Sequence, residues 1–400
     1  MGQQTLAIEP VPDNERRVEP AIYAVVDPRT DPYSRAGAMD LLLLGCGRVG
    51  RAVADLVLRR ADHLQERYGV AARWVALGDS SGFLFDPQGL HPTVVAEACR
   101  AKAAGHPLRS LPGASAGDAE PMVERALACR LSRPVLVDVS DGDGDAAAAY
   151  HAALRSGCDV VTANKKPFAG AEFAALRAEA RAHARILRGE ATVGAGLPVL
   201  ATLEHLLASG DEVRRIEGCF SGTLGFVLCG LEAGRGLVEV VEDAVERGLA
   251  EPDPVADLCG ADVGRKALIL GRLSGLLDDP EQVELEGLVP GSLAGLDPEA
   301  LRQRLAALDA PLRWRLEAAR CQGRRLRYVA TIERGRARVG LVEVPSDSPL
   351  AALESTDNIA VFHTARYCER PLAVSGPGAG VEVTAMGVFA DLVHVAAERR

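Results

Sequence analysis

Short runs of consecutive apolar residues alternate with helix-like segments in the first half of the chain. Leu41 to Leu44 is one such run, and Trp74 to Leu77 is another. Runs of this length are typical of strands that are buried on both faces of a parallel sheet. The predicted strands are 41–44, 74–77, 134–139, 159–162 and 186–187, and the predicted helices include 146–156 and 172–184. Strands and helices that alternate in this way indicate βαβ units and an α/β fold.

The pattern changes beyond residue 190, where longer strands show partial alternation of apolar and polar positions. Strands are predicted at 215–220, 327–332 and 337–342, and helices at 197–208, 237–247, 262–275 and 299–319. A last helix over 383–397 is predicted to follow a glycine-rich turn at 376–380. We therefore expect a second, α+β domain with an open mixed sheet, which a second copy of the chain can complete.

Composition narrows the class of protein. The 400 residues include 45 basic and 55 acidic side chains, a net charge of −10, which argues against a reader of nucleic-acid phosphates. Aromatic residues make up 4% of the chain, too few for platforms that stack single-stranded bases. No apolar run reaches the roughly 20 residues of a membrane-spanning helix, so we expect no membrane partner. The length of the chain predicts two globular domains, or one domain with a large partner.

Nine cysteines are spread along the chain, and no two lie within four residues of each other. An odd number at such spacings is unlike a disulfide framework or a zinc site, so we expect reduced thiols and a cytoplasmic protein. The eight histidines form no HxxxH or HExxH pair, which argues against a metal site built from histidine.

A glycine motif lies where the first predicted strand ends and a helix begins, in the sequence Gly45-Cys46-Gly47-Arg48-Val49-Gly50. In a dinucleotide-binding loop, the first glycine permits a tight turn and the second lets the pyrophosphate approach the backbone. The third glycine lets the helix pack on the strand, and free N–H groups at the helix start face the anion. The motif in this context predicts an NAD or NADP site in a Rossmann-type domain.

Asp79 ends the second predicted strand, where a carboxylate can bind the ribose hydroxyls of NAD. It lies 29 residues beyond Gly50, a longer spacing than the usual ~20. A carboxylate that caps a turn over Asp79-Ser80-Ser81 is an equally good interpretation. Arg48 can supply charge for the 2′-phosphate of NADP, so the sequence leaves the choice of cofactor open.

Four carboxylates and two prolines lie between Glu251 and Asp262, just before an apolar helix. Asp262 and Lys266 are spaced i and i+4 on one helical face, which continues with Leu270 and Leu273. A lysine in line with leucines is partly desolvated and suited to proton transfer. The alternative is an exposed Asp–Lys pair, which adds only a few tenths of a kcal/mol to helix stability.

Three further segments contain candidate site residues. Lys165 lies in the segment 162–167, just past the carboxyl end of a predicted strand, which is the edge where open α/β sheets bind ligands. Glu190 precedes a glycine-rich turn whose carbonyls can hold a hard cation. Ser221-Gly222-Thr223 follows a strand and offers hydroxyl and amide donors for a carboxylate. A solvated loop lysine and ordinary turn chemistry are the alternatives.

Taken together, these motifs resemble homoserine dehydrogenase. The matching strings are GCGRVG at 45–50, TANKK at 162–166, EATVGAGLP at 190–198, SGT at 221–223, EPDPVADLCGAD at 251–262, RK at 265–266, TDN at 356–358 and GPGAGVEVTAMGVFADL at 376–392. The resemblance implies an oxidoreductase of threonine and methionine biosynthesis. Its reaction is the reversible reduction of L-aspartate 4-semialdehyde to L-homoserine with NADPH or NADH, in a homodimer.

The resemblance also implies roles for particular residues. Lys266 corresponds to the proton donor, with Asp262 beside it and Lys165 as a second catalytic lysine. The implied homoserine contacts are Gly222, Thr223, Glu251 and Asp262, and the implied cofactor contacts are Ser140, Lys165, Gly380 and the loop of Gly45, Gly47, Arg48, Val49 and Gly50. A monovalent cation, Na⁺ or K⁺, is implied at Glu190 and the main-chain atoms of Val193, Ala195 and Leu197.

We divide the chain accordingly into an N-terminal extension over 1–38, a dinucleotide-binding domain over 39–189 and a substrate-binding, catalytic and dimerisation domain over 190–377. The C-terminal helix over 378–400 is expected to complete the dinucleotide-binding domain. We expect no counterpart of the C-terminal regulatory domain of many bacterial family members, and therefore no threonine feedback through such a domain.

Two positions depart from the family pattern. Family members often have tyrosine where this chain has Leu249, and they usually continue after SGT with a polar or small residue, tyrosine and isoleucine, where this chain has Leu224 to Val227. Both positions lie near the expected substrate pocket. A relative that reduces another small amino-acid semialdehyde is therefore the second hypothesis, and a catalytically inactive dinucleotide-binding protein is the third.

Overall fold

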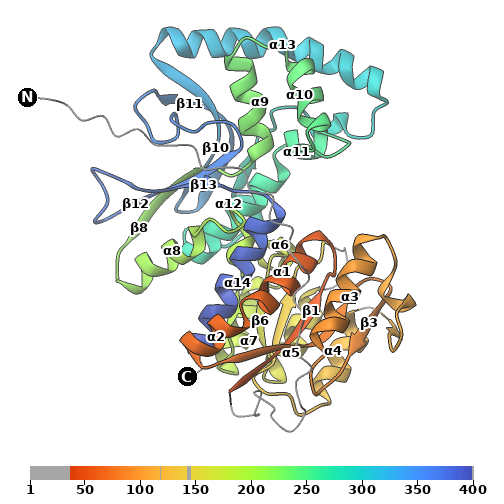
Figure 1. The fold of residues 1–400 in the computed structure, drawn as a ribbon. Coiled ribbons are helices and arrows are strands. Elements are labelled where there is room, and N and C mark those ends of the chain that lie inside the picture. The colour runs from red at the N-terminus through yellow and green to blue at the C-terminus, as the bar shows by residue number, and fades with distance from the viewer. Residues whose placement is uncertain (1–36, 118, 142–145, 399–400) are drawn as a thin grey trace, which may run out of the picture.

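The computed structural model describes residues 37–117, 119–141 and 146–398, and Figure 1 shows them as two bodies that are each built on one β-sheet. The irregular N-terminal extension expected over 1–38 lies outside the described residues except for its last two positions. The mixed α/β class predicted from the sequence is confirmed.

The first sheet has seven strands in the order β4-β3-β2-β1-β5-β6-β7. Its parallel strands are β1 (Ala38–Leu44), β2 (Ala71–Gly78), β5 (Val135–Asp138), β6 (Asp159–Thr162) and β7 (Leu187–Arg188), and β3 (Gly82–Phe85) and β4 (Ser115–Ala116) add an antiparallel edge. Every residue of β1 is buried, as its apolar run predicts. The strand order reverses between β1 and β5, and open parallel sheets bind ligands at the carboxyl ends of strands at such a switch point.

Helices cover both faces of this sheet (Figure 1). One face carries α1 (Arg48–Arg59), α2 (Ala61–Tyr68), α3 (Pro92–Ala103) and α14 (Val381–Glu398), and the other carries α4 (Ala119–Leu127), α5 (Ala146–Arg155) and α7 (Phe173–Ala182). The last helix, α14, lies beside α1 although the whole second sheet separates them in sequence.

The second sheet has six strands in the order β13-β12-β8-β10-β11-β9. The strands are β8 (Val213–Cys219), β9 (Val283–Leu285), β10 (Arg324–Glu333), β11 (Arg336–Pro345), β12 (Asp357–Thr364) and β13 (Leu372–Pro377). All neighbours are antiparallel except β9 and β11, so the sheet is mixed as expected. The helices packed around its main core include α8 (Val199–Ala208), α9 (Gly222–Glu232), α10 (Leu237–Glu246), α11 (Val255–Leu258), α12 (Ala261–Ser274) and α13 (Pro298–Cys321).

Helix α9 corrects the interpretation of Ser221-Gly222-Thr223 as a turn. Ser221 is the N-cap of this helix, and its Oγ accepts a hydrogen bond of 3.2 Å from the Leu224 N–H. The glycines in α9 lower its helix propensity, but they let another segment approach closely. A Cβ at Gly225 would lie 2.5 Å from the Ser355 carbonyl oxygen, and one at Gly222 would lie 2.8 Å from that of Thr356.

The glycine-rich turn predicted at 376–380 begins later than expected. Gly376 and Pro377 are the last residues of β13, where they face Asn358 and Asp357 of β12. The turn itself comprises only residues 378–380, and α14 follows at Val381.

Candidate active site

Two lysines from different parts of the fold meet at one carboxylate. Lys266 lies on α12 and is 9% exposed, and its Nζ lies 2.9 Å from Asp262 Oδ2. Lys165 Nζ lies 3.2 Å from the other oxygen, Oδ1. Lys266 also donates a hydrogen bond of 2.6 Å to the main-chain oxygen of Phe220, directly before the SGT motif. The exposed Asp–Lys pair considered from the sequence is therefore not what the structure shows, because Lys266 is buried.

The electrostatics of this cluster favour charged groups. Burial alone would raise the pKa of Asp262, but the ammonium groups of Lys266 and Lys165 outweigh that effect and hold its pKa well below the usual range. Asp262 is therefore an anion at neutral pH, and it can hold both ammonium groups in fixed positions.

A buried polar network positions Lys165. Lys165 is the first residue of the short helix α6 (Lys165–Ala169), and Asn164 is its N-cap, with Oδ1 accepting from the Lys166 N–H at 3.0 Å. Asn164 Nδ2 donates to Asp138 Oδ2 at 3.2 Å, and the Tyr150 hydroxyl donates to the same oxygen at 2.6 Å. Neither Asp138 nor Tyr150 was predicted as a site residue from the sequence. The signal for Asp138 was a carboxylate at the carboxyl end of a buried strand, next to the strand before Lys165.

Arg272 connects the helices that carry the two lysines. It lies near the end of α12, and its Nη1 donates to the carbonyl oxygens of Phe168 at 3.0 Å and Gly170 at 2.7 Å, at the end of α6. Because α6 follows strand β6 of the first sheet and α12 packs on the second sheet, this contact joins the two bodies that carry the lysines. Arg272 was also missed, since an arginine inside an apolar helix gives no sequence signal for its partner.

The glycine loop has the geometry that its motif predicts. Gly45 has a φ of +91°, and a Cβ at Gly50 would lie 2.0 Å from the Gly45 oxygen, so the turn and the helix start touch directly. A Cβ at Gly47 would meet no atom of the described residues within 4 Å, which leaves the backbone there open to a ligand. Ser140 lies against the loop, since its N would be 2.6 Å from a Cβ at Gly45. Arg48 and Val49 begin α1.

Asp79 makes the turn-capping contacts that were the alternative to ribose binding. Its Oδ1 accepts hydrogen bonds from the Ser81 N–H at 2.8 Å, the Ser81 hydroxyl at 2.6 Å and the Gly82 N–H at 3.1 Å. Its Oδ2 lies 2.5 Å from Lys102 Nζ. Burial opposes ionisation, but Lys102 and Ser81 lower the pKa of Asp79 to about 2. A contact between Asp79 and a ribose hydroxyl remains a prediction. The hydroxyl would have to replace one of these donors or share an Asp79 oxygen with it.

The residues predicted to bind the substrate do not all lie at the lysine cluster. Gly222 opens α9, and the buried Thr223 donates its hydroxyl to the Leu249 carbonyl oxygen at 2.6 Å. The side chain of Glu251 is exposed and lies outside the contacts of the lysine cluster, while its N–H donates to Asp257 at 2.9 Å. Gly380 has a φ of +113° and accepts the Thr384 N–H at 2.9 Å where α14 begins.

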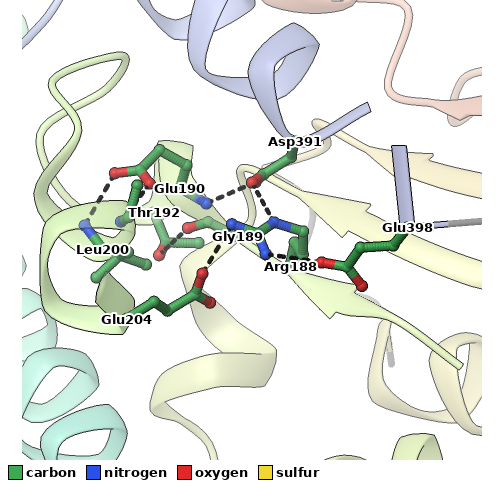
Figure 2. Close-up of polar contacts among 9 residues, drawn as sticks. Arg188, Gly189, Glu190, Thr192, Leu200, Glu204, Asp391 and Glu398 are labelled. Carbon is green, nitrogen blue, oxygen red and sulfur yellow. Dashed lines mark hydrogen bonds and ion pairs between the residues drawn. The ribbon is translucent and has the colours of Figure 1, made fainter. Parts of the chain in front are cut away.

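Glu190 is buried at the junction between the two sheets, and Figure 2 shows its surroundings. Its two carboxylate oxygens accept the Leu200 N–H at 2.9 Å and the Ala201 N–H at 2.7 Å, in the first turn of α8. Burial raises the pKa of Glu190 to about 7 despite these two donors. Its own N–H donates to Asp391 Oδ2 at 2.8 Å, which joins it to α14.

The loop after Glu190 turns sharply against α14. Gly194 and Ala195 have φ values of +81° and +55°, and the Leu197 N–H bonds back to the Gly194 oxygen at 2.9 Å. The Ala195 carbonyl would lie 2.5 Å from a Cβ at Gly387, so only glycine fits on α14 there. Within the described part of the chain, no group of three or more His, Cys, Asp or Glu side chains is placed to hold a metal ion. A cation here would therefore depend on one carboxylate and main-chain carbonyls.

Comparison with known proteins identifies the family. A model of the homoserine dehydrogenase NAD-binding domain matches residues 45–190, and the homoserine dehydrogenase model matches residues 198–393. The chain belongs to the homoserine dehydrogenase family. Members of this family are NAD(P)-dependent oxidoreductases, and the Rossmann-type domain described above is their cofactor domain.

Individual relatives agree with this assignment. A homoserine dehydrogenase of Emericella nidulans is 38% identical over 371 residues, which are 88% of this chain and 97% of that protein. A bifunctional aspartokinase/homoserine dehydrogenase of Haemophilus influenzae is 34% identical over 387 residues, 96% of this chain but only 45% of the relative. A solved structure of a hyperthermophilic archaeal homoserine dehydrogenase in complex with NADPH has a TM-score of 0.70 at 28% identity, covering 90% of this chain and 98% of that chain. None of the helices in the described residues is both long and apolar enough to cross a membrane.

Proposed function

We propose that this protein catalyses the reversible, NAD(P)H-dependent reduction of L-aspartate 4-semialdehyde to L-homoserine. The observation that carries the proposal is the meeting of Lys165 and Lys266 at Asp262, beside the segment that begins at Phe220. Reduction of an aldehyde places negative charge on its oxygen, and a fixed ammonium group stabilises that charge and then donates a proton.

Lys266 is the proposed proton donor. It is buried and held at two points, Asp262 and the Phe220 oxygen, so its third N–H is free in direction to reach a substrate oxygen. Lys165 sits on the dinucleotide side of the same carboxylate and is more exposed, which suits a group that contacts both cofactor and substrate. Asp262 positions both lysines, and its negative charge offsets part of the positive charge of the two ammonium groups.

The proposed cofactor site is the glycine loop with Ser140, Lys165 and Gly380. The open backbone at Gly47 and the free N–H groups at the start of α1 fit a pyrophosphate. When bound, the nicotinamide supplies the hydride that reduces the aldehyde carbon. The chain's own contribution is to orient that ring and to place Lys266 at the oxygen.

The charges of the site indicate which residues would bind each end of the substrate. We propose that the carboxylates of Glu251 and Asp262 receive the substrate's α-ammonium group, and that Gly222 and Thr223 at the start of α9 receive its α-carboxylate. The N-terminus of an eleven-residue helix favours an anion. Since Glu251 is exposed, closure of its loop over the substrate is part of the proposal.

A monovalent cation is proposed at Glu190 and the main-chain oxygens of Val193, Ala195 and Leu197. Carboxylate and carbonyl oxygens are hard ligands that suit Na⁺ or K⁺. The pKa of Glu190 near 7 shows that ionisation is costly at this buried position, and a bound cation would favour the ionised form.

We also propose a homodimer and a cytoplasmic location. β13 lies at one edge of the second sheet, and edge strands carry unpaired main-chain groups that another chain can bond or cover. All nine cysteines are free thiols, as expected in a reducing compartment.

A second candidate is the reduction of a different small amino-acid semialdehyde. It is favoured by Leu249, whose carbonyl is bonded to Thr223 and whose apolar side chain stands where the family often has tyrosine. Steady-state oxidation of NADPH and of NADH with aspartate semialdehyde, and with longer or N-substituted analogues, tests both functions. A higher kcat/KM for aspartate semialdehyde supports the first, and a higher value for an analogue supports the second.

A further inference from the structure

Helix α6, which carries Lys165, is too short to keep its direction by itself. It has five residues, and an isolated helix of this length is not stable in water. The last carbonyl groups of a helix also lack partners within it, so they need donors from elsewhere. The direction in which α6 presents Lys165 therefore depends on contacts with other parts of the protein.

Arg272 supplies the donor at the end of α6. Its Nη1 donates to the carbonyl oxygens of Phe168 at 3.0 Å and Gly170 at 2.7 Å. Hydrogen bonds from a guanidinium group are charge-assisted and stronger than those between neutral groups. The Phe168 side chain is buried in the main core of the second sheet. The end of α6 is therefore held to the second body by both its main chain and a side chain.

The start of α6 is held by the first body. Asn164 is the N-cap of α6, and its Nδ2 donates to Asp138 Oδ2 at the end of β5. This contact fixes where the helix begins, but one anchor leaves the direction of the helix free. The contacts of Arg272 at the other end supply the second anchor.

Arg272 and Asp262 lie on the same helix, α12. They are ten residues apart, which is about 15 Å along a helix axis. Asp262 contacts Lys165 at the start of α6, and Arg272 contacts the end of α6. Helix α12 therefore binds α6 at both ends, and a shift of α6 along or away from α12 would have to break the Arg272 contacts.

We propose that Arg272 is a positioning residue that holds Lys165 beside Asp262 by binding the end of α6. The part of this inference that concerns catalysis rests on the proposed function. Without the Arg272 donors, α6 can tilt and Lys165 Nζ can move away from Asp262. Small displacements of reacting groups are costly, so we expect kcat to fall about tenfold.

Acetylation of lysines tests the position of Lys165 without any assay of activity. The chain contains four lysines, Lys102, Lys165, Lys166 and Lys266. The full-length protein without cofactor is treated with a limiting amount of acetic anhydride, digested and analysed by mass spectrometry. A neighbouring carboxylate favours the protonated, unreactive form of an amine. Arg272→Met keeps an apolar stem but has no donor, so Lys165 should react several-fold faster in this variant.

Two controls belong to the acetylation experiment. Lys102 is the internal reference, because it lies 2.5 Å from Asp79 in the first body and its rate should not change. Arg177→Met is the matched variant. The Arg177 guanidinium lies 5.7 Å from the Phe173 ring, as that of Arg272 does at 5.8 Å, but among the described contacts it makes no hydrogen bond to α6. An unchanged Lys165 rate in Arg272→Met, or an equal increase in Arg177→Met, would overturn the proposal.

A double-mutant cycle tests the consequence for catalysis. Arg272→Met should lower kcat about tenfold by itself, but it should have little further effect in a Lys165→Ala protein, because the positioned group is already gone. Arg272→Lys keeps one cationic donor and should restore part of the loss. A general structural role would lower kcat by the same factor in both backgrounds, and that result would refute positioning through Lys165.

The two experiments distinguish this proposal from the proposed function. Failure of the unsubstituted protein to reduce aspartate semialdehyde with NADPH or NADH, or an unchanged kcat in Lys165→Ala, would count against the proposed function. The acetylation rates would still show whether Arg272 holds Lys165 at Asp262. Faster acetylation of Lys165 in Arg272→Met with an unchanged kcat would refute only the catalytic part of the proposal.

Discussion

Lys266 donates a hydrogen bond of 2.6 Å to the main-chain oxygen of Phe220, and this contact joins helix α12 to the end of strand β8. Phe220 is followed by Ser221, the N-cap of α9, so the carbonyl that holds the ammonium group and the proposed carboxylate site belong to one continuous segment. The hydrogen bond to the Phe220 oxygen and the ion pair with Asp262 together fix the position of Lys266 Nζ. Lys266 therefore has a defined position before any substrate arrives, which lowers the entropic cost of catalysis.

Replacing Lys266 by alanine should lower kcat at least ~100-fold, the low end of a general acid's contribution. The physical reason is that Asp262 and the Phe220 oxygen remain, but neither can donate a proton. Arg265→Ala is the matched control, because Arg265 is the exposed neighbour on the same helix and should leave kcat unchanged. Unchanged turnover in a Lys266→Ala protein with a normal melting temperature would exclude Lys266 as the donor.

Two glycine substitutions should separate cofactor binding from folding. Gly47→Ala adds a methyl group that meets no described atom within 4 Å, at a residue with a φ of −80°, so stability should hold while the KM for the cofactor rises about tenfold. Gly50→Ala places its Cβ 2.0 Å from the Gly45 oxygen and should cost about 2 kcal/mol of unfolding free energy. Urea unfolding and steady-state kinetics measure the two effects, and an unchanged cofactor KM in Gly47→Ala would argue against a pyrophosphate at the loop.

The fold was predictable where local pattern and burial agree. The β1 run of leucines and the strand at Asp159–Thr162 are buried on both sides, so their composition gives direct evidence of their environment. Strands β12 and β13 were not predicted because β12 pairs with β8, which lies far away in sequence, and β13 pairs in turn with β12. Helix α9 was not predicted because it contains glycines. Gly222 and Gly225 are required by the close approach of Thr356 and Ser355, which only the folded structure shows.

The same division applies to the candidate site. The i to i+4 spacing of Asp262 and Lys266 predicted their contact, because helix geometry is local. The contact of Asp262 with Lys165 and the bridge from Arg272 to α6 each join distant segments, so spacing alone could not reveal them. Asp79 is the converse case. Its two interpretations, ribose binding and turn capping, differ in the partners of the carboxylate, and the fold alone brings the main partner, Lys102, close to it.

Glu190 should give the protein a characteristic dependence of stability on pH. Burial raises its folded pKa from 4.5 to about 7, so the folded protein keeps a proton that the unfolded chain releases in this interval. The free energy of unfolding should fall as the pH rises from about 4.5 to 7, by at most about 3 kcal/mol, and then level off. Urea unfolding at several pH values measures this slope.

Glu190→Gln should lose that slope, whereas Glu204→Gln, which changes an exposed carboxylate nearby, should keep it. Added K⁺ should reduce the loss at high pH if a cation binds the ionised Glu190, and a bulky quaternary ammonium ion should not. An equal slope in the Glu190→Gln variant would show that other groups cause the pH dependence.

Asp391 should be the most important anchor of the C-terminal helix. Its carboxylate is 2% exposed and accepts hydrogen bonds of 2.8 Å from both Arg188 Nε and the Glu190 N–H (Figure 2). Asp391→Asn leaves the Arg188 guanidinium, which is mostly buried, without its main counter-charge and should cost about 3 kcal/mol in urea unfolding. Glu204 contacts the same arginine at 2.8 Å from a side chain that is 53% exposed, so Glu204→Gln should cost well under 1 kcal/mol.

Equal losses in the two variants would mean that burial does not decide the strength of these pairs. A much larger loss for Asp391→Asn, with a raised KM for the cofactor, would show that α14 supports both the loop after Glu190 and, through α1, the glycine loop.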